Sequence, residues 1–153
     1  MAAFEFDRTV VVAGEASDAW GLIVDVPRLV GWISILHDAQ EIEPLSSYTA
    51  VIRDKVGMFT LRADLAIRVS DVEEGRRIVV EAEGQDRQVG SRITIHSEVS
   101  LAQGLSSTEV RVRGNYAITG NAATLGSSTI RRKGEKILDE FCCHLGTESS
   151  AAG

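Results

Sequence analysis

The 153 residues are enough for one domain with one sizeable core, and a content of 44% hydrophobic and 25% charged residues is typical of globular proteins. The formal net charge of −6 argues against a nucleic-acid or anionic-lipid surface, because both depend on clustered Lys and Arg. The chain has no run of about 18 apolar residues that could span a membrane and no signal-peptide pattern at its start, so we expect a cytoplasmic protein.

The first part of the chain predicts one strand followed by two short helices. Residues Ala3–Val12 alternate between apolar and polar side chains, which is typical of a strand with one buried face. Asp18 indicates the start of the first short helix, because aspartate is favoured at helix N-termini. Asp25 and Pro27 indicate an N-cap and an early-turn proline, so we expect the second helix over Pro27–Ile33.

The middle of the chain predicts strands with little else between them. Apolar and polar residues alternate, so that one face of each strand is buried and the other faces water, which indicates an antiparallel sheet. The first of these strands is short, and we expect it at the sheet edge. The predicted strands are Gln40–Pro44, Tyr48–Val56, Met58–Val72, Arg77–Gly84, Gly90–Leu101 and Thr108–Ile118.

The last predicted element is one long helix from about Asn121 to Leu145. Its apolar residues recur at intervals of three and four, which places them on one stripe, and charged residues occupy the opposite face. The stripe consists of Gly126, Ile130, Gly134, Ile137, Leu138, Phe141 and Leu145. Such a one-sided helix needs a broad apolar surface, which the sheet supplies. We expect one domain over residues 1–146 and a flexible polar tail over 147–153.

Three groups of motifs carry a resemblance to a known family. They are Phe4-Glu5-Phe6 with Val10-Val11-Val12, Lys55-Val56-Gly57-Met58-Phe59, and Leu125-Gly126-Ser127 with Lys136-Ile137. These motifs resemble the opening, the central hairpin and the closing helix of proteins similar to the G subunit of carbon monoxide dehydrogenase. The order of elements resembles the helix-grip fold of the START-like (SRPBCC) superfamily. The resemblance implies an α+β fold, with a bent antiparallel sheet of about seven strands wrapped around the C-terminal helix.

The space between helix and sheet is where we expect function. Gly126 and Gly134 allow the helix either to pack closely on the sheet or to leave room beneath it. Small residues on the inward faces of neighbouring strands, Ala63, Ala82, Ser97 and Gly114, favour room. Trp32 and Ile33 are then expected at the cavity mouth. The remaining predicted ligand-binding residues are Ile52, Phe59, Leu61, Ser97, Val99, Tyr116, Ile130, Gly134, Ile137 and Phe141.

Two residues could bring polar chemistry to such a cavity. Tyr116 could donate a hydrogen bond to a ligand carbonyl, or its hydroxyl could meet only backbone or water. Asp54 shares the inward parity of its strand, and a desolvated carboxylate could act as an acid or base. The alternative for Asp54 is a solvated pair with Arg53 or Lys55. The histidines are scattered without metal-ligand spacing, so the sequence predicts no metal and no cofactor.

The resemblance implies a carrier of a hydrophobic small molecule, lipid-like or quinone-like, or an accessory protein to a molybdenum hydroxylase system. We expect ligand exchange near Trp32 and the Lys55–Phe59 hairpin. The alternative is a polyketide cyclase- or hydrolase-like enzyme in the same cavity, with Asp54 and Tyr116 as the catalytic candidates. The scarcity of ionisable residues favours the non-catalytic hypothesis. A redox-enzyme partner and transient membrane contact are further expectations, whereas no nucleic-acid partner is expected.

Overall fold

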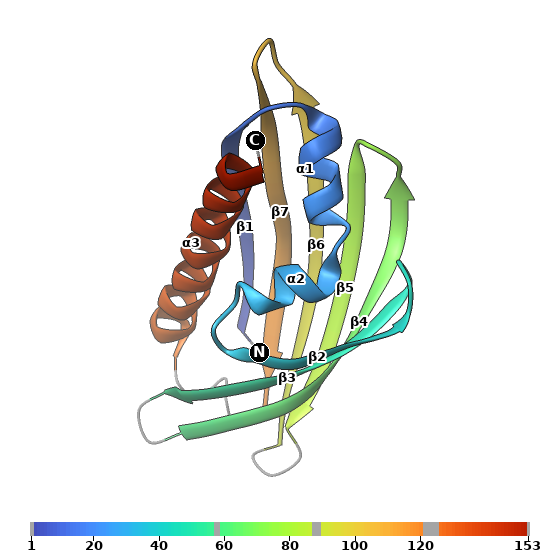
Figure 1. Cartoon of the computed structure of the whole chain (residues 1–153). Helices are drawn as coiled ribbons and strands as arrows, with labels where there is room; N and C mark the ends of the chain where they lie inside the picture. The colour runs from blue at the N-terminus through green and yellow to red at the C-terminus, as the bar shows by residue number, and fades with distance from the viewer. Residues whose placement is uncertain (1, 57–58, 87–89, 121–125, 153) are drawn as a thin grey trace.

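The computed structural model describes residues 2–56, 59–86, 90–120 and 126–152, with side chains described for 3–55, 60–86, 90–120 and 126–147. Within these ranges, seven strands form one antiparallel sheet in the order β1-β7-β6-β5-β4-β3-β2 (Figure 1). The strands are β1 (Ala2–Ala13), β2 (Leu36–Glu43), β3 (Ser47–Val56), β4 (Phe59–Glu73), β5 (Arg77–Asp86), β6 (Ser91–Gln103) and β7 (Ser107–Thr119). The helices are α1 (Ala16–Ile23), α2 (Val26–Gly31) and α3 (Ser127–Ala152). The predicted helix-grip fold is confirmed.

The edge strand β2 is the strand whose bounds differ most from the prediction. It begins at Leu36 instead of Gln40, although it does lie at the sheet edge. Its pairing with β3 shifts register between His37 and Gln40, and Asp38 has a positive φ of 54°. Such a bulge interrupts the two-residue alternation, so the early part of the strand carries no readable pattern.

Helix α3 is displaced along the chain relative to the prediction. The predicted start at Asn121 lies outside the described residues, and the helix begins at Ser127. Gly126 precedes the helix with a φ of 93° and is exposed, so it does not belong to the apolar stripe. The helix also continues to Ala152, so the predicted end at Leu145 is wrong, and the backbone of residues 147–152 in the predicted tail is helical. Once a helix is formed, each further residue adds one backbone hydrogen bond, so the helix can extend beyond the last residue of its apolar stripe.

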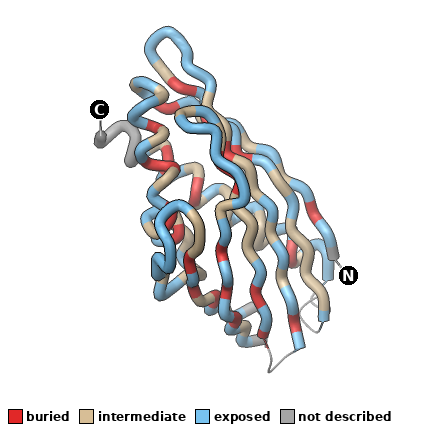
Figure 2. Tube along the Cα trace, turned by 90° about the vertical axis from the view of Figure 1, so that its right-hand side faces the viewer, coloured by how far each residue is buried: buried red, intermediate tan, exposed pale blue. Residues whose placement is uncertain are grey.

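All three helices lie on one side of the bent sheet (Figure 1), and buried and exposed residues alternate along the strands (Figure 2). Two larger clusters of buried side chains fill this side, and a small third one packs Ile130 of α3 on Phe4 of β1. The first joins Ile23 of α1 and Leu145 of α3 to Val110 of β7. The second joins Val30 of α2 to Ile52 of β3 and its neighbours on β4. The two clusters together hold the helices against the sheet at two separate places.

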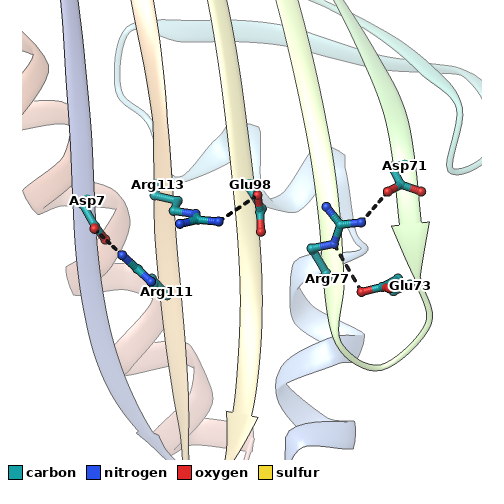
Figure 3. Close-up of polar contacts among 7 residues, drawn as sticks. All are labelled: Asp7, Asp71, Glu73, Arg77, Glu98, Arg111 and Arg113. Atoms are coloured by element: carbon teal, nitrogen blue, oxygen red, sulfur yellow. Dashed lines mark hydrogen bonds and ion pairs between the residues drawn. The ribbon is translucent and has the colours of Figure 1, made fainter.

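The opposite face of the sheet carries cross-strand ion pairs, several of which Figure 3 shows. Arg111 Nη2 of β7 lies 2.6 Å from Asp7 Oδ2 of β1, and this guanidinium lowers the pKa of the Asp7 carboxyl. Arg77 of β5 contacts Asp71 of β4 at 2.5 Å. Exposed pairs of this kind contribute little to stability. They indicate a solvated outer face, and they direct the search for a site to the inner face.

No helix in the described ranges is long and apolar enough to cross a lipid bilayer.

Two leucine substitutions test how α3 is anchored. Leu145 is 0% exposed within the first cluster, whereas Leu105 in the β6–β7 turn is 108% exposed. We expect Leu145→Ala to lower the free energy of unfolding by about 2–5 kcal/mol and Leu105→Ala to change it by less than about 0.5 kcal/mol. Urea denaturation measures both. Equal small losses would show that the C-terminal half of α3 does not pack on the core.

Candidate functional site

A cavity of about 320 Å³ lies beneath α3, between this helix, α2 and the inner face of the sheet. All seven strands contribute to its walls, and most of the side chains that line it are apolar. Its volume is near the lower end of the roughly 300–1,000 Å³ that small-molecule pockets occupy. Of the two packing alternatives that the sequence leaves open, the structure has the one in which the helix leaves room.

The small residues contribute to the cavity in different ways. Ala82 and Ser97 line it, as does Gly134 on the helix. Ala63 instead packs inside the second cluster. At Gly114 a Cβ would lie 3.0 Å from the Phe6 ring and 1.9 Å from a backbone oxygen of β6, so this glycine permits close packing. The two small strand residues Ala82 and Ser97 therefore contribute to the hollow, whereas Gly134 permits the close approach of Tyr116 to the helix.

Most of the predicted ligand-binding residues lie in the cavity wall. Those that line it are Ile33, Ile52, Leu61, Ser97, Val99, Tyr116, Ile130, Gly134, Ile137 and Phe141. The Phe59 side chain lies outside the described residues. Their role in binding remains a prediction. The sequence reasoning missed the wall that α2 forms through Val26, Leu29 and Val30, although the apolar residues of the predicted second helix were a signal for it.

Trp32 does not lie at the cavity mouth, and the prediction that placed it there is corrected. Its side chain is only 6% exposed and belongs to the first buried cluster. Its ring centre lies 5.6 Å from that of Phe141 and 6.0 Å from that of His144, which it stacks on. Beside it, the Ser34 backbone N–H donates a hydrogen bond to Glu140 of α3. This side of the cavity is therefore closed by packing.

Asp54 faces the cavity, with a partner that the sequence reasoning did not identify. Its Oδ2 lies 3.0 Å from Nζ of Lys133 on α3, and its Oδ1 accepts a hydrogen bond from the Lys55 backbone N–H at 2.9 Å. Arg53 pairs with Asp38 instead. The sequence analysis expected the charged residues of this helix on the face opposite the apolar stripe and did not single out Lys133. Its position three residues after Ile130, at the border of the apolar stripe, was the signal for its true place.

Tyr116 lies between the inner cavity and a second hollow. Its ring stacks on Phe4 at 5.1 Å, and its hydroxyl lies against the backbone of α3, where a Cβ at Gly134 would be 2.2 Å from Oη. Burial raises the pKa of the Tyr116 phenol, so the hydroxyl stays protonated at neutral pH. Within the described residues this hydroxyl has no hydrogen-bond partner, and neither does that of Ser97. Both are available to a ligand.

The second hollow is a groove of about 800 Å³ between β1 and α3. It is more polar than the cavity, and the Arg131 guanidinium lies 5.6 Å above the Phe4 ring at its side. The residues that line both hollows are Phe6, Tyr116, Gly134 and Leu138. These residues therefore form the wall between the cavity and the groove.

The charged groups at the cavity are few. Asp54 and Lys133 are the charged residues among the described lining residues, and they pair with each other. The described residues also contain no group of three His, Cys, Asp or Glu side chains that could hold a metal ion. This arrangement is suited to enclosing an apolar molecule with a few polar contacts.

Comparison with known proteins connects this architecture to a family. The family model of CoxG, the G subunit of carbon monoxide dehydrogenase, matches residues 9–149. No curated protein matches the chain in sequence closely enough to count as a relative.

Several solved structures share the fold. A conserved protein from Geobacillus kaustophilus superposes with a TM-score of 0.83 at 14% identity, covering 97% of each chain. A START superfamily protein from Mycobacterium smegmatis has a TM-score of 0.74 at 12% identity and covers 97% of this chain and 99% of that one. The Zhui aromatase/cyclase from Streptomyces sp. R1128 has a TM-score of 0.67 at 13% identity, with 97% and 94% covered. At these identities the likeness concerns the fold alone.

The contact between Tyr116 and Gly134 generates a stability prediction. We expect Gly134→Ala to lower the free energy of unfolding by about 1–3 kcal/mol, because the new Cβ overlaps the Tyr116 hydroxyl. In a Tyr116→Phe background the loss should be smaller, since the closest atom is gone. Gly146→Ala on the same helix meets nothing within 4 Å and should stabilise by up to about 1 kcal/mol. If both alanines had the same effect by urea denaturation, the close contact at Gly134 would be refuted.

Proposed function

The chain belongs to the CoxG family, named for the G subunit of carbon monoxide dehydrogenase, and from this premise we propose that it binds and carries a hydrophobic small molecule in the cavity beneath α3. The observation that supports this most strongly is the cavity itself: about 320 Å³ of space with a largely apolar wall. An apolar ligand that enters it leaves water, which contributes about 25 cal/mol per Å² of apolar surface before the costs of association.

The size of the cavity limits the ligand. The volume of 320 Å³ equals that of roughly ten water molecules. A compact ring system or a short chain fits this space, as the head of a quinone-like or lipid-like molecule would. A longer tail would extend beyond it, and the groove behind Tyr116 is one space that could receive it. The unpartnered hydroxyls of Tyr116 and Ser97 would then orient the ligand.

An accessory role in a molybdenum hydroxylase system is the finer part of this proposal. The family description, which names a subunit of carbon monoxide dehydrogenase, supports it. The ion-paired outer face of the sheet and the net charge of −6 offer a polar surface to a redox-enzyme partner. We also keep the cytoplasmic location and a transient membrane contact, at which an apolar ligand would be exchanged, within the proposal.

A cyclase-like enzyme is the second candidate. The likeness in fold to the Zhui aromatase/cyclase favours it, as does a carboxylate in the cavity wall. The contact between Asp54 and Lys133 counts against it, because the carboxylate that would have to act on a substrate is already engaged by a side chain of α3. We therefore rank carriage above catalysis.

Filling the cavity tests the proposal. Ala82 of β5 lines the cavity, whereas Ala66 of β4 is exposed on the outer face of the same sheet. We expect Ala82→Phe to weaken binding of the apolar fluorophore N-phenyl-1-naphthylamine at least tenfold, because the new ring occupies the space. Ala66→Phe is the matched control and should bind as the unaltered protein does. Fluorescence titration measures the binding, and circular dichroism verifies the fold. A folded Ala82→Phe protein with undiminished binding would refute this location of the ligand.

A further inference from the structure

We propose that the ion pair between Asp54 and Lys133 is the polar anchor of the cavity, and that the ligand is an uncharged molecule whose carbonyl or other neutral oxygen accepts a hydrogen bond from Lys133. This inference rests on the proposed function and deepens it by naming the ligand's polar group.

The pair is part of the cavity wall. Lys133 Nζ and Asp54 Oδ2 are 3.0 Å apart, and their side chains are 32% and 13% exposed. The contact joins the end of β3 to α3 across an otherwise apolar space. Taking charges out of water is costly, and a partly buried pair contributes little net stability. Stability alone therefore gives a poor reason for a pair at this position.

The Lys133 ammonium has hydrogen-bond donors left over at the pair, although both oxygens of Asp54 are already in contact with a donor. Each oxygen of Asp54 already accepts one contact, Oδ2 from Lys133 and Oδ1 from the Lys55 backbone N–H. The Lys133 ammonium has three N–H donors, and within the described residues Asp54 is its ion-pair partner. Two N–H groups thus remain without an ion-pair partner among the described residues, on a side chain that lines the cavity. A ligand group that meets them must be an acceptor.

The charge balance of the pair favours a neutral acceptor. Asp54 already compensates the charge of Lys133, so a ligand carboxylate would bring a second negative charge close to the first. That charge would also be desolvated in the apolar cavity without a cation of its own. A carbonyl oxygen accepts a hydrogen bond from Lys133 without this cost, and a charge-assisted hydrogen bond is stronger than a neutral one.

A second donor lies on the same stretch of α3. The Tyr116 hydroxyl rests against Gly134, the residue next to Lys133, and has no partner in the described residues. Both Tyr116 and Lys133 line the cavity. The cavity therefore offers donors from two elements beside α3, Lys133 of the helix and Tyr116 of β7, whereas the other strand residues that line it are mostly apolar.

A pair of ligands of the same shape tests the inference. 2-Acetylnaphthalene carries a carbonyl where 2-isopropenylnaphthalene carries a CH₂ group, so the two differ in the acceptor oxygen and hardly in form. Their affinities are measured by displacement of N-phenyl-1-naphthylamine and corrected for the partition of each ligand between water and octanol. The proteins are the unaltered chain, the double variant Asp54→Leu/Lys133→Met, and the control Arg68→Met/Glu81→Leu. The control removes an exposed pair from the outer face with the same change in charge.

We expect the unaltered protein and the control to prefer the ketone, and the cavity variant to lose this preference by about tenfold. An equal preference in all three proteins would overturn the inference. Tighter binding of 2-naphthoate than of the ketone to the unaltered protein would also overturn it, because the ligand would then be an anion.

The fluorophore separates this inference from the proposed function. If N-phenyl-1-naphthylamine binds and the ketone preference is absent, only the role of Lys133 fails. If neither the fluorophore nor either naphthalene binds, the proposed function fails with it.

Discussion

The site depends on how α3 is held: it is attached to the rest of the fold at a few residues, and a hollow lies beneath the part of the helix between them. Its C-terminal half is anchored by Leu145 in the first buried cluster. Three polar contacts attach its flanks to separate elements. They are Arg8 of β1 with Asp139 at 2.6 Å, the Ser34 N–H with Glu140, and Asp54 of β3 with Lys133 at 3.0 Å. Between these attachments the helix faces small strand residues, and a hollow remains.

Such a hollow lowers the stability of the folded protein, so a protein that binds no ligand would be expected to have a solidly packed core instead. Unfilled volume in a core lowers stability, because the lining atoms lose van der Waals partners. The two buried clusters on either side carry the packing that offsets this loss. A bound apolar molecule would restore the missing contacts, and it would stabilise the folded state in proportion to its occupancy. Ligand binding and stability therefore both depend on how well the space under α3 is filled.

The strands and the long helix could be predicted because their periodicities are long and regular. Most of the apolar cavity wall followed from the same parity argument, as Ile52, Val99 and Ile137 illustrate. Trp32 could not be placed, since the turn after α2 decides on which side its ring lies. Lys133 was missed because a charged residue at the border of an apolar stripe reads as solvated. Its partner Asp54 is distant in sequence, and only the tertiary structure brings the two together.

A crystal structure of the protein purified from its own cells is the most direct test of the central claim, that α3 roofs a hollow which holds an apolar molecule. The account predicts continuous non-protein density under α3, in contact with Ile95 of β6 and Ile137 of the helix, with both residues in the cavity wall. A structure in which α3 has moved onto the sheet, so that Ile137 and Leu138 fill the space and no density remains, would contradict it.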